Sequence, residues 1–199
     1  MKRVKLAAAE SPVLSTITPE QERRLLLDLG NDITRVRDKN DLLTLFKQRI
    51  KGLFYISHTI ITLIDYKDET YTPFLLDNEG SPIRSHERYQ EMVHFHFSLN
   101  EPFIQAVLQS EDPLSFVLEE IMDKPLSPPF LRVNYERGVR EILMTKLMKE
   151  GKPMGFIHTY TDKPEGFSSE FRSLMKGIAP QLSSAVSNII KNEEIFKKE

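Results

Sequence analysis

The sequence predicts an α/β protein of the α+β type, with an antiparallel sheet of about five or six strands. Three observations support this fold class. Two pairs of apolar, β-branched runs, each joined by a short polar break, are typical of β-hairpins. A pair of amphipathic helices is expected near the start of the chain. A longer amphipathic helix is expected in its last thirty or so residues.

The clearest hairpin comprises residues 142–148 and 154–161. Both runs are rich in β-branched, aromatic and methionine side chains, which favour paired strands. The expected turn between them is Glu150-Gly151-Lys152-Pro153. Glycine permits a positive φ there, and proline cannot donate a hydrogen bond to a neighbouring strand.

The last helix is expected over residues 168–198, with Ser168 or Ser169 as its N-cap and Glu170 in its first turn. From there one stripe recurs at spacings of four and three, which is a heptad pattern. Its members are Phe171, Met175, Ile178, Leu182, Ala185, Ile189, Asn192 and Phe196.

The N-terminal half predicts two helices and a second hairpin. Thr18 is the expected N-cap of a helix that runs to about Arg37, with Pro19 at its first position. Its apolar stripe holds Leu26, Leu29, Ile33 and Val36. A second helix is expected over residues 42–53, and strands over residues 58–66 and 70–76.

The middle of the chain, residues 78–137, is irregular and punctuated by prolines. The strict alternation of residues 93–97 predicts a short strand. Short helices are expected over residues 102–109, 116–122 and 130–137.

Composition limits the function classes. The 199 residues suffice for one domain, expected over residues 19–199 after a flexible leader of residues 1–18. Formal net charge is -2 and no basic stripe interleaves with aromatic residues, so binding to nucleic acid is not expected. No apolar run reaches the roughly 20 residues of a membrane helix, and no signal peptide is recognisable, which favours the cytoplasm. Zero cysteines exclude disulfides, thiolate zinc sites and thiol nucleophiles.

The order of these features resembles a GAF domain, the small-molecule sensor module of histidine kinases, phosphodiesterases and bacterial transcriptional activators. The resemblance covers about residues 20–195, and it depends on the order of many loose motifs. In the C-terminal half they are Gly138-Val139-Arg140-Glu141-Ile142-Leu143, Leu147-Met148, Gly155-Phe156-Ile157-His158, Pro164, Gly166, Phe167, Ser168-Ser169-Glu170, Leu174, Ile178-Ala179 and Gln181-Leu182. In the N-terminal half they are Asp38, Asp41-Leu42-Leu43 and Phe46.

The resemblance implies helices from both ends of the chain on one face of the sheet, and residues 78–137 as a roof over a ligand pocket on the other. Bilin attachment through cysteine and reduction of free methionine sulfoxide both need a cysteine, so neither is expected. The Asn-Lys-x-x-Asp signature of cyclic-nucleotide-binding members has no counterpart. The sequence does not indicate a particular cofactor.

Two imidazoles, His94 and His96, lie two residues apart and would share one face of the expected strand. They are candidate ligand contacts, and also a feasible pair of metal ligands if His158 or His86 supplied a third. The alternative is that both are polar residues of an edge strand, and no metal site is predicted.

Further candidate contacts come from the last strand and from the segment before the central strand. His158 and Tyr160 share a face with Phe156, and the alternative for them is a half-buried core. Tyr135 and Arg140, with Arg132 and Arg137 nearby, form a cluster suited to an anionic effector. The alternative for this cluster is surface arginines paired with local glutamates.

The last helix also predicts self-association. Ile189, Ile190, Ile195 and Phe196 are expected beyond the sheet contact, where they need another apolar partner. A parallel homodimer would supply one, through a seam with Ile178, Leu182, Ala185, Ile189 and Phe196, and Asn192 would set its register.

The function that we expect is that of a non-enzymatic sensory domain, in signal transduction or transcription regulation. It would bind a small effector and relay the event through its terminal helices to an output domain in a longer chain. The alternative is a structural dimerisation module with a filled or vestigial pocket, and an enzyme is the third possibility. A filled core between sheet and roof would favour the second.

Overall fold

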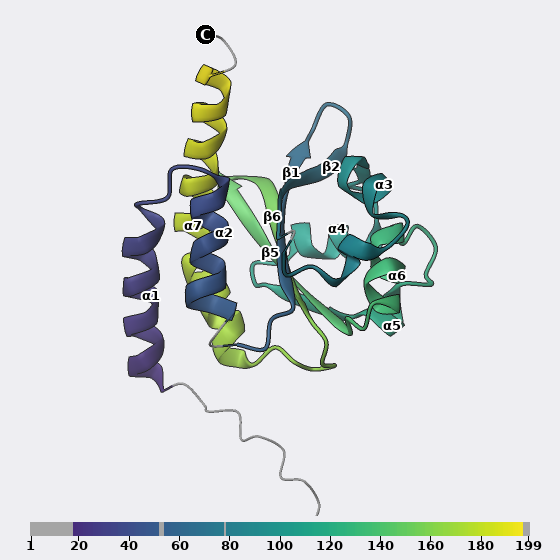
Figure 1. The fold of residues 1–199 in the computed structure, drawn as a ribbon, viewed down its shortest axis with the longest axis horizontal. Coiled ribbons are helices and arrows are strands. Elements are labelled where there is room, and N and C mark those ends of the chain that lie inside the picture. The colour runs from purple at the N-terminus through teal and green to yellow at the C-terminus, as the bar shows by residue number, and fades with distance from the viewer. Residues whose placement is uncertain (1–17, 52–53, 78, 197–199) are drawn as a thin grey trace, which may run out of the picture.

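The computed structural model describes residues 18–51, 54–77 and 79–196 (Figure 1). The expected leader, apart from Thr18, lies outside the described residues. In chain order the elements are α1 (Pro19–Ile33), α2 (Lys39–Leu45), a π-helical segment (Phe46–Lys51), β1 (His58–Asp65), β2 (Thr70–Leu76), a 3₁₀ turn (Pro82–Ser85), α3 (Tyr89–His94), β3 (Phe97–Ser98), α4 (Pro102–Gln109), β4 (Leu114–Val117), α5 (Leu118–Ile121), α6 (Pro129–Glu136), β5 (Glu141–Lys149), β6 (Lys152–Thr161) and α7 (Ser169–Phe196).

The sheet has six strands in the order β3-β2-β1-β6-β5-β4, and every neighbouring pair is antiparallel. The expected fold class and strand number are therefore confirmed. The two hairpins, β1–β2 and β5–β6, meet at the centre of the sheet, where β1 pairs with β6. This pairing places His58 opposite Tyr160 and Ile60 opposite His158.

The turn of the β5–β6 hairpin is shorter than the sequence suggested. Glu150 and Gly151 have φ values of 50° and 77°, the double left-handed conformation that a two-residue hairpin turn requires. Lys152 and Pro153 belong to β6 instead of the turn. Pro153 is tolerated there because it lies opposite Met148 next to an irregularity in the β5–β6 pairing, where no regular hydrogen bond is needed.

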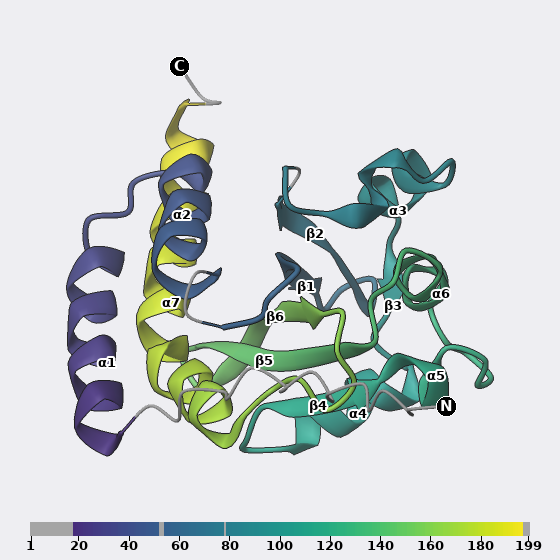
Figure 2. The ribbon, with the colours of Figure 1, turned by 60° about the horizontal axis from the view of Figure 1, so that its bottom comes forward.

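The sheet separates a helical layer from a roof (Figure 2). On one face α7 packs against β5, with α2 beside it and α1 outermost against α7. On the other face lie α3, α4, α5 and α6, as expected for residues 78–137. Because side chains of a strand alternate, β5 serves both faces: Leu143 and Leu147 belong to the core beneath α7, and Ile142 and Met144 to the core beneath the roof.

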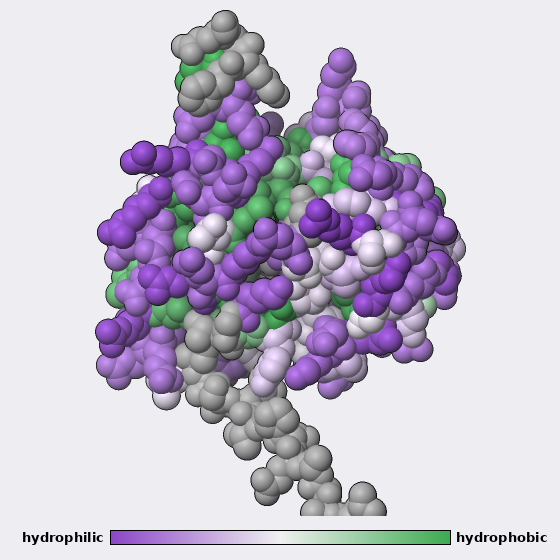
Figure 3. All heavy atoms as spheres, in the orientation of Figure 1, coloured by the Kyte–Doolittle hydropathy of each residue, from purple (hydrophilic) through white to green (hydrophobic). Residues whose placement is uncertain are grey.

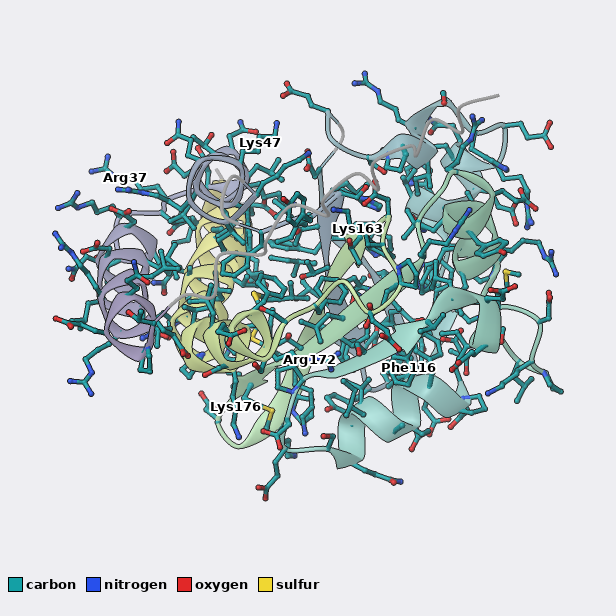
Figure 4. All side chains as sticks on the ribbon, turned by 90° about the horizontal axis from the view of Figure 1, so that it is seen from below. Arg37, Lys47, Phe116, Lys163, Arg172 and Lys176 are labelled. Carbon is teal, nitrogen blue, oxygen red and sulfur yellow. The ribbon has the colours of Figure 1, made fainter. Side chains whose placement is uncertain are left out.

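Arg172, in the first turn of α7, connects the helical layer to the edge of the sheet (Figure 4). Its Nη2 donates to Ser115 Oγ of β4 at 2.6 Å and lies 3.6 Å from the buried carboxylate of Glu141 at the start of β5. The other oxygen of Glu141 accepts a hydrogen bond from the backbone N–H of Gly166 at 2.7 Å. The buried charge of Glu141 is thereby compensated from two sides.

The expected structure of two segments is wrong. Residues 93–97 were expected to be a strand, but α3 extends to His94 and β3 comprises Phe97 and Ser98 alone. Residues 116–122 were expected to be a helix, but Phe116 and Val117 complete β4 and only Leu118–Ile121 is helical. In both places a short segment takes the structure that its neighbours impose, since β4 exists by pairing with β5.

The opening helices also differ in extent. The first was expected to reach Arg37, but α1 ends at Ile33. The second was expected over residues 42–53, but α2 begins earlier, where the Asp38 side chain accepts hydrogen bonds from the N–H groups of Asn40 and Asp41. It continues as the π-helical segment to Lys51, and residues 52–53 lie outside the described part of the chain.

The apolar stripe of α7 is buried inside the protein's own core as far as Ile189. The expectation that Ile189 and Ile190 lie beyond the sheet contact is therefore wrong, because Ile189 is only 1% exposed and Ile190 packs against the same core. Asn192 faces outward, with its Nδ2 3.5 Å from the carbonyl oxygen of Arg37. Ile195 is exposed. On the face shown in Figure 3, hydrophobic residues are visible chiefly between the helical layer and the sheet.

The start of α1 is fixed by a reciprocal cap. Thr18 Oγ1 accepts a hydrogen bond from the Gln21 N–H at 3.2 Å, and Gln21 Oε1 accepts one from the Thr18 N–H at 2.8 Å. We expect Thr18→Ala to lower the free energy of unfolding by about 1 kcal/mol, because one N–H of the first turn loses its acceptor. Urea unfolding followed by circular dichroism measures the loss, and Thr18→Ser should restore most of it.

None of the helices formed by the described residues has both the length and the apolar character needed to cross a bilayer.

Candidate functional site

An apolar cavity lies between the central strands and the roof. The space open to the centre of a water-sized sphere is about 30 Å³, which is room for about two water molecules. The residues that line it are Ile60, Thr62, Tyr71, Pro73, Leu76, Asp77, Ser81, Ile83, Tyr89, Met92, Val93, Phe97, Phe130, Asn134, His158 and Tyr160.

His158 lies on the sheet side of this cavity and is 1% exposed. Its Nε2 is 2.9 Å from Thr62 Oγ1 on the neighbouring strand, whereas its Nδ1 has no hydrogen-bond partner among the described residues. Burial lowers the pKa of His158 to about 3, and the nearby His58 acts in the same direction. The imidazole is therefore neutral near neutral pH.

Two further polar residues, His58 and Asn134, were not among the sequence candidates. Asn134 of α6 is fully buried and lines the cavity, and its Nδ2 donates to the carbonyl oxygen of Phe130 at 2.8 Å. Its Oδ1 lies near the His58 imidazole, but neither this oxygen nor His58 Nε2 makes a hydrogen bond of regular geometry with any described residue. His58 stacks on Tyr160 with ring centroids 4.3 Å apart. Burial, followed by the charge of Lys51, lowers the pKa of His58 to about 3, while Asn134 opposes the shift.

A buried acid lies behind the cavity wall. Tyr71 contributes its ring to the wall, and its hydroxyl donates to Glu101 Oε2 at 2.6 Å. Burial raises the pKa of Glu101 to about 7, although the hydrogen bonds from Tyr71 and from the backbone N–H of Ser98 oppose the shift. Glu101 is also the N-cap residue of α4, so this pair links the sheet to the roof.

Asp77 and Ser81 lie at the margin of the cavity, where β2 ends. Asp77 is 5% exposed; its Oδ1 accepts a hydrogen bond from the Gly80 N–H at 3.0 Å and lies 3.8 Å from Lys47 Nζ. Lys47 is held in turn by Glu79 at 2.5 Å. Lys47 is therefore a shared counter-charge for the two carboxylates at this margin.

The structure brings only two of the six expected ligand contacts to the cavity, His158 and Tyr160. His94 and His96 are exposed and do not line it, because α3 takes the place of the expected strand. Among the described residues no group of three or more histidine, aspartate or glutamate side chains is arranged to hold a metal ion.

The expected anion site ahead of β5 is occupied by local contacts. Arg140 Nη1 donates to the carbonyl oxygens of Tyr135 and Val139, and its guanidinium lies 4.4 Å from the Tyr135 ring centroid. Arg132 pairs with Asp123, and Arg137 donates to the carbonyl oxygen of Ser85. Neither Tyr135 nor Arg140 lines the cavity, so the alternative of local pairing describes this cluster.

No family model and no curated protein matches the chain. Solved structures do. The chain is similar to the GAF domain of a phosphoenolpyruvate-protein phosphotransferase from Acinetobacter, with 16% identity, a TM-score of 0.62 and coverage of 89% of this chain and 99% of that one. The GAF domain of the phosphoenolpyruvate-protein phosphotransferase from Coxiella burnetii is 12% identical, with a TM-score of 0.64 and coverage of 87% of this chain and 96% of that one. The phycoerythrobilin-bound GAF domain of a cyanobacterial phytochrome is 10% identical, with a TM-score of 0.57 and coverage of 88% of this chain and 100% of that one.

Proposed function

Because the chain has the fold of a GAF domain, we propose that it is a non-enzymatic sensory domain that binds a small effector between the sheet and the roof. The observation that carries the proposal is a pair of buried atoms, His158 Nδ1 and Asn134 Oδ1, that make no hydrogen bond with any described residue and belong to residues lining one apolar cavity. A buried polar atom without a partner is costly, so a ligand that satisfies both gains affinity.

The same strands connect the cavity to the C-terminal helix. Ile142 and Met144 of β5 lie in the core beneath the roof, and Leu143 and Leu147 of the same strand pack beneath α7. Near the end of β5, the Met148 N–H donates to Ser183 Oγ of α7 at 3.0 Å. A shift of the central strands on effector binding would therefore displace α7, which we propose relays it to an output domain.

Catalysis is not part of this proposal. His158, the one histidine that lines the cavity in the described structure, has a pKa of about 3 and is too weak a base for proton transfer near neutral pH. The polar groups around the cavity are suited to hold a ligand by hydrogen bonds.

Native mass spectrometry of protein purified from its own host tests the proposal. We expect a second mass that corresponds to one small molecule per chain and is lost on denaturation. Val93→Phe adds bulk at the cavity and should abolish that mass, whereas Val36→Phe makes the same change in the helical layer and should retain it. A single unliganded mass from the host, together with hydrogen exchange in α7 that is unchanged by any host extract, would refute the effector role.

The small size of the cavity favours the second candidate function, a structural dimerisation module. Of the expected seam, Ile178, Leu182, Ala185 and Ile189 belong to the protein's own core, so they cannot form a dimer contact without leaving it. Among the described side chains of α7, Ile195 is an apolar one that could form a dimer contact, since it is 58% exposed.

We expect Ile195→Asp to weaken self-association if α7 forms a dimer, while the fold remains intact. Lys191→Asp, at another exposed position of the same helix, should have little effect. Ile189→Asp should instead unfold the domain, because it places a charge in the core, at a cost of several kcal/mol. Sedimentation equilibrium and thermal unfolding of the three variants separate these effects. A folded Ile189→Asp variant would contradict the core assignment.

A further inference from the structure

Building on the proposed function, we propose that the effector is an uncharged, compact aromatic molecule with a hydrogen-bond donor, which binds Asn134 Oδ1 and His158 Nδ1 after Met92 moves aside. The inference concerns the chemical class of the ligand. It follows from the charge, the shape and the free hydrogen-bonding atoms of the cavity.

The charge of the lining groups excludes an ionic effector. Asp77 is the one carboxylate among the described lining residues, and it is already held by the Gly80 N–H and by the nearby Lys47. His158 is neutral, and no lysine or arginine side chain lines the cavity in the described structure. An ion that entered would lose its hydration without gaining a counter-charge.

The shape of the lining favours a planar ring. His158 and Phe130 have ring centroids 5.9 Å apart at 69°, and Phe97 and Phe130 have theirs 5.0 Å apart at 85°. These edge-to-face arrangements, with Tyr71 and Tyr160 also in the wall, offer both ring faces and ring edges. Another aromatic ring can pack against such a surface in the geometry that aromatic pairs prefer.

The free atoms define the polar group of the ligand. The Asn134 amide is oriented by the bond from its Nδ2 to Phe130, so Oδ1 can only accept. The ligand must therefore carry an O–H or N–H. When Thr62 Oγ1 donates to Nε2 of His158, Nδ1 carries the proton and donates. A single hydroxyl can then donate to Asn134 Oδ1 and accept from His158 Nδ1.

The size of the cavity requires a movable side chain, since about 30 Å³ does not hold a ring. Met92 projects from α3, a six-residue helix whose N-cap residue makes no side-chain capping bond. Its thioether side chain is unbranched and buried, and it belongs to the core beneath the roof. Methionine changes rotamer with little cost, which makes Met92 the side chain best placed to yield.

The test uses three probes with one ring and different substituents at about pH 7.5, where phenol is neutral and benzoate is ionised. Phenol carries the donor, anisole masks it with a methyl group, and benzoate adds a charge. Saturation-transfer NMR measures binding, and the methyl resonance of ¹³C-labelled Met92 reports its place. The exposed Met148 methyl is the control.

We expect phenol to bind and to shift the Met92 resonance, anisole to bind about ten-fold more weakly, and benzoate not to bind. Met92→Ala should tighten phenol binding about five-fold or more by opening the cavity. Asn134→Leu should reduce the preference for phenol over anisole to about two-fold or less. The probe preference of the parent protein decides the matter even if Asn134→Leu does not fold.

The outcomes that overturn the inference are distinct from failure of the proposed function. Equal binding of anisole, or any binding of benzoate at the Met92 methyl, refutes the class of ligand. If no probe binds the parent or Met92→Ala but host-purified protein carries a small molecule, the class is wrong and the sensory function holds. If no probe binds and no small molecule is carried, both are refuted.

Discussion

Gly155→Ala is expected to lower the free energy of unfolding by about 3–5 kcal/mol. Gly155 lies in β6 opposite Leu63 of β1. A Cβ atom there would lie 2.1 Å from the carbonyl oxygen of Thr62 and 3.2 Å from its carbonyl carbon. Backbone atoms at the centre of a sheet cannot yield as a side chain can, so the two hairpins would be forced apart.

Urea unfolding followed by far-UV circular dichroism measures this loss. Gly30→Ala is the matched control, because the nearest atom to its added Cβ belongs to the Gln181 side-chain amide, at 3.8 Å, an ordinary contact. This control should be neutral or gain up to about 1 kcal/mol, since alanine favours the helix. A loss of less than about 1 kcal/mol for Gly155→Ala would contradict the close β1–β6 approach.

Acidification from about pH 7.5 to about pH 5 is expected to destabilise the protein through its two buried histidines. Their folded-state pKa values of about 3 lie below the ordinary value of 6.5. Their contribution to stability is therefore complete above about pH 6.5 and is lost as the pH falls towards 3. At about pH 5 the loss is about 2 kcal/mol for each histidine.

Glu101 acts in the opposite direction. Its folded-state pKa of about 7 lies above the ordinary value of 4.5, so its contribution to stability grows as the pH falls through 7 and is lost as the pH rises. By about pH 5 it offsets about 2 kcal/mol. The parent protein should therefore lose about 2 kcal/mol in net terms, and Glu101→Gln about 4 kcal/mol.

Urea unfolding at several pH values, with circular dichroism as the readout, tests the effect of the two histidines and the opposing effect of Glu101. Glu101→Gln should also be more stable than the parent near pH 8, because it removes the cost of a buried charge there. Glu194→Gln, at an exposed position of α7, should follow the parent. Stability that rises on acidification of Glu101→Gln would contradict the buried, neutral histidines. Identical slopes for the parent and Glu101→Gln would contradict the raised pKa of Glu101.

The sequence predicts the elements that carry their own pattern. The strands from His58 and from Lys152 are long apolar runs flanked by turn residues, and α7 has a clear N-cap and stripe. Segments 93–97 and 116–122 were misassigned because their structure depends on partners. Alternation of histidine and phenylalanine over 93–97 indicates a strand locally, but burying Met92 and Phe97 beneath the roof decides otherwise.

The site was predicted in part. His158 and Tyr160 could be placed because alternation puts them on one face of a strand whose fold was recognised. Asn134 could not, since a lone asparagine in a short amphipathic helix has no distinguishing pattern. His58 could not either, because its place opposite Tyr160 follows from the β1–β6 register, which no local signal encodes.

The central place of the β1–β6 pair also determines when the protein can fold. Residues joined by this pair, such as His58 and Tyr160, are about a hundred positions apart along the chain, and contacts of such separation form slowly. While a ribosome is still making β6, the β1–β2 hairpin has an open edge where its central neighbour belongs. A nascent chain of this protein is thus vulnerable to aggregation or to capture by chaperones until its last strand emerges.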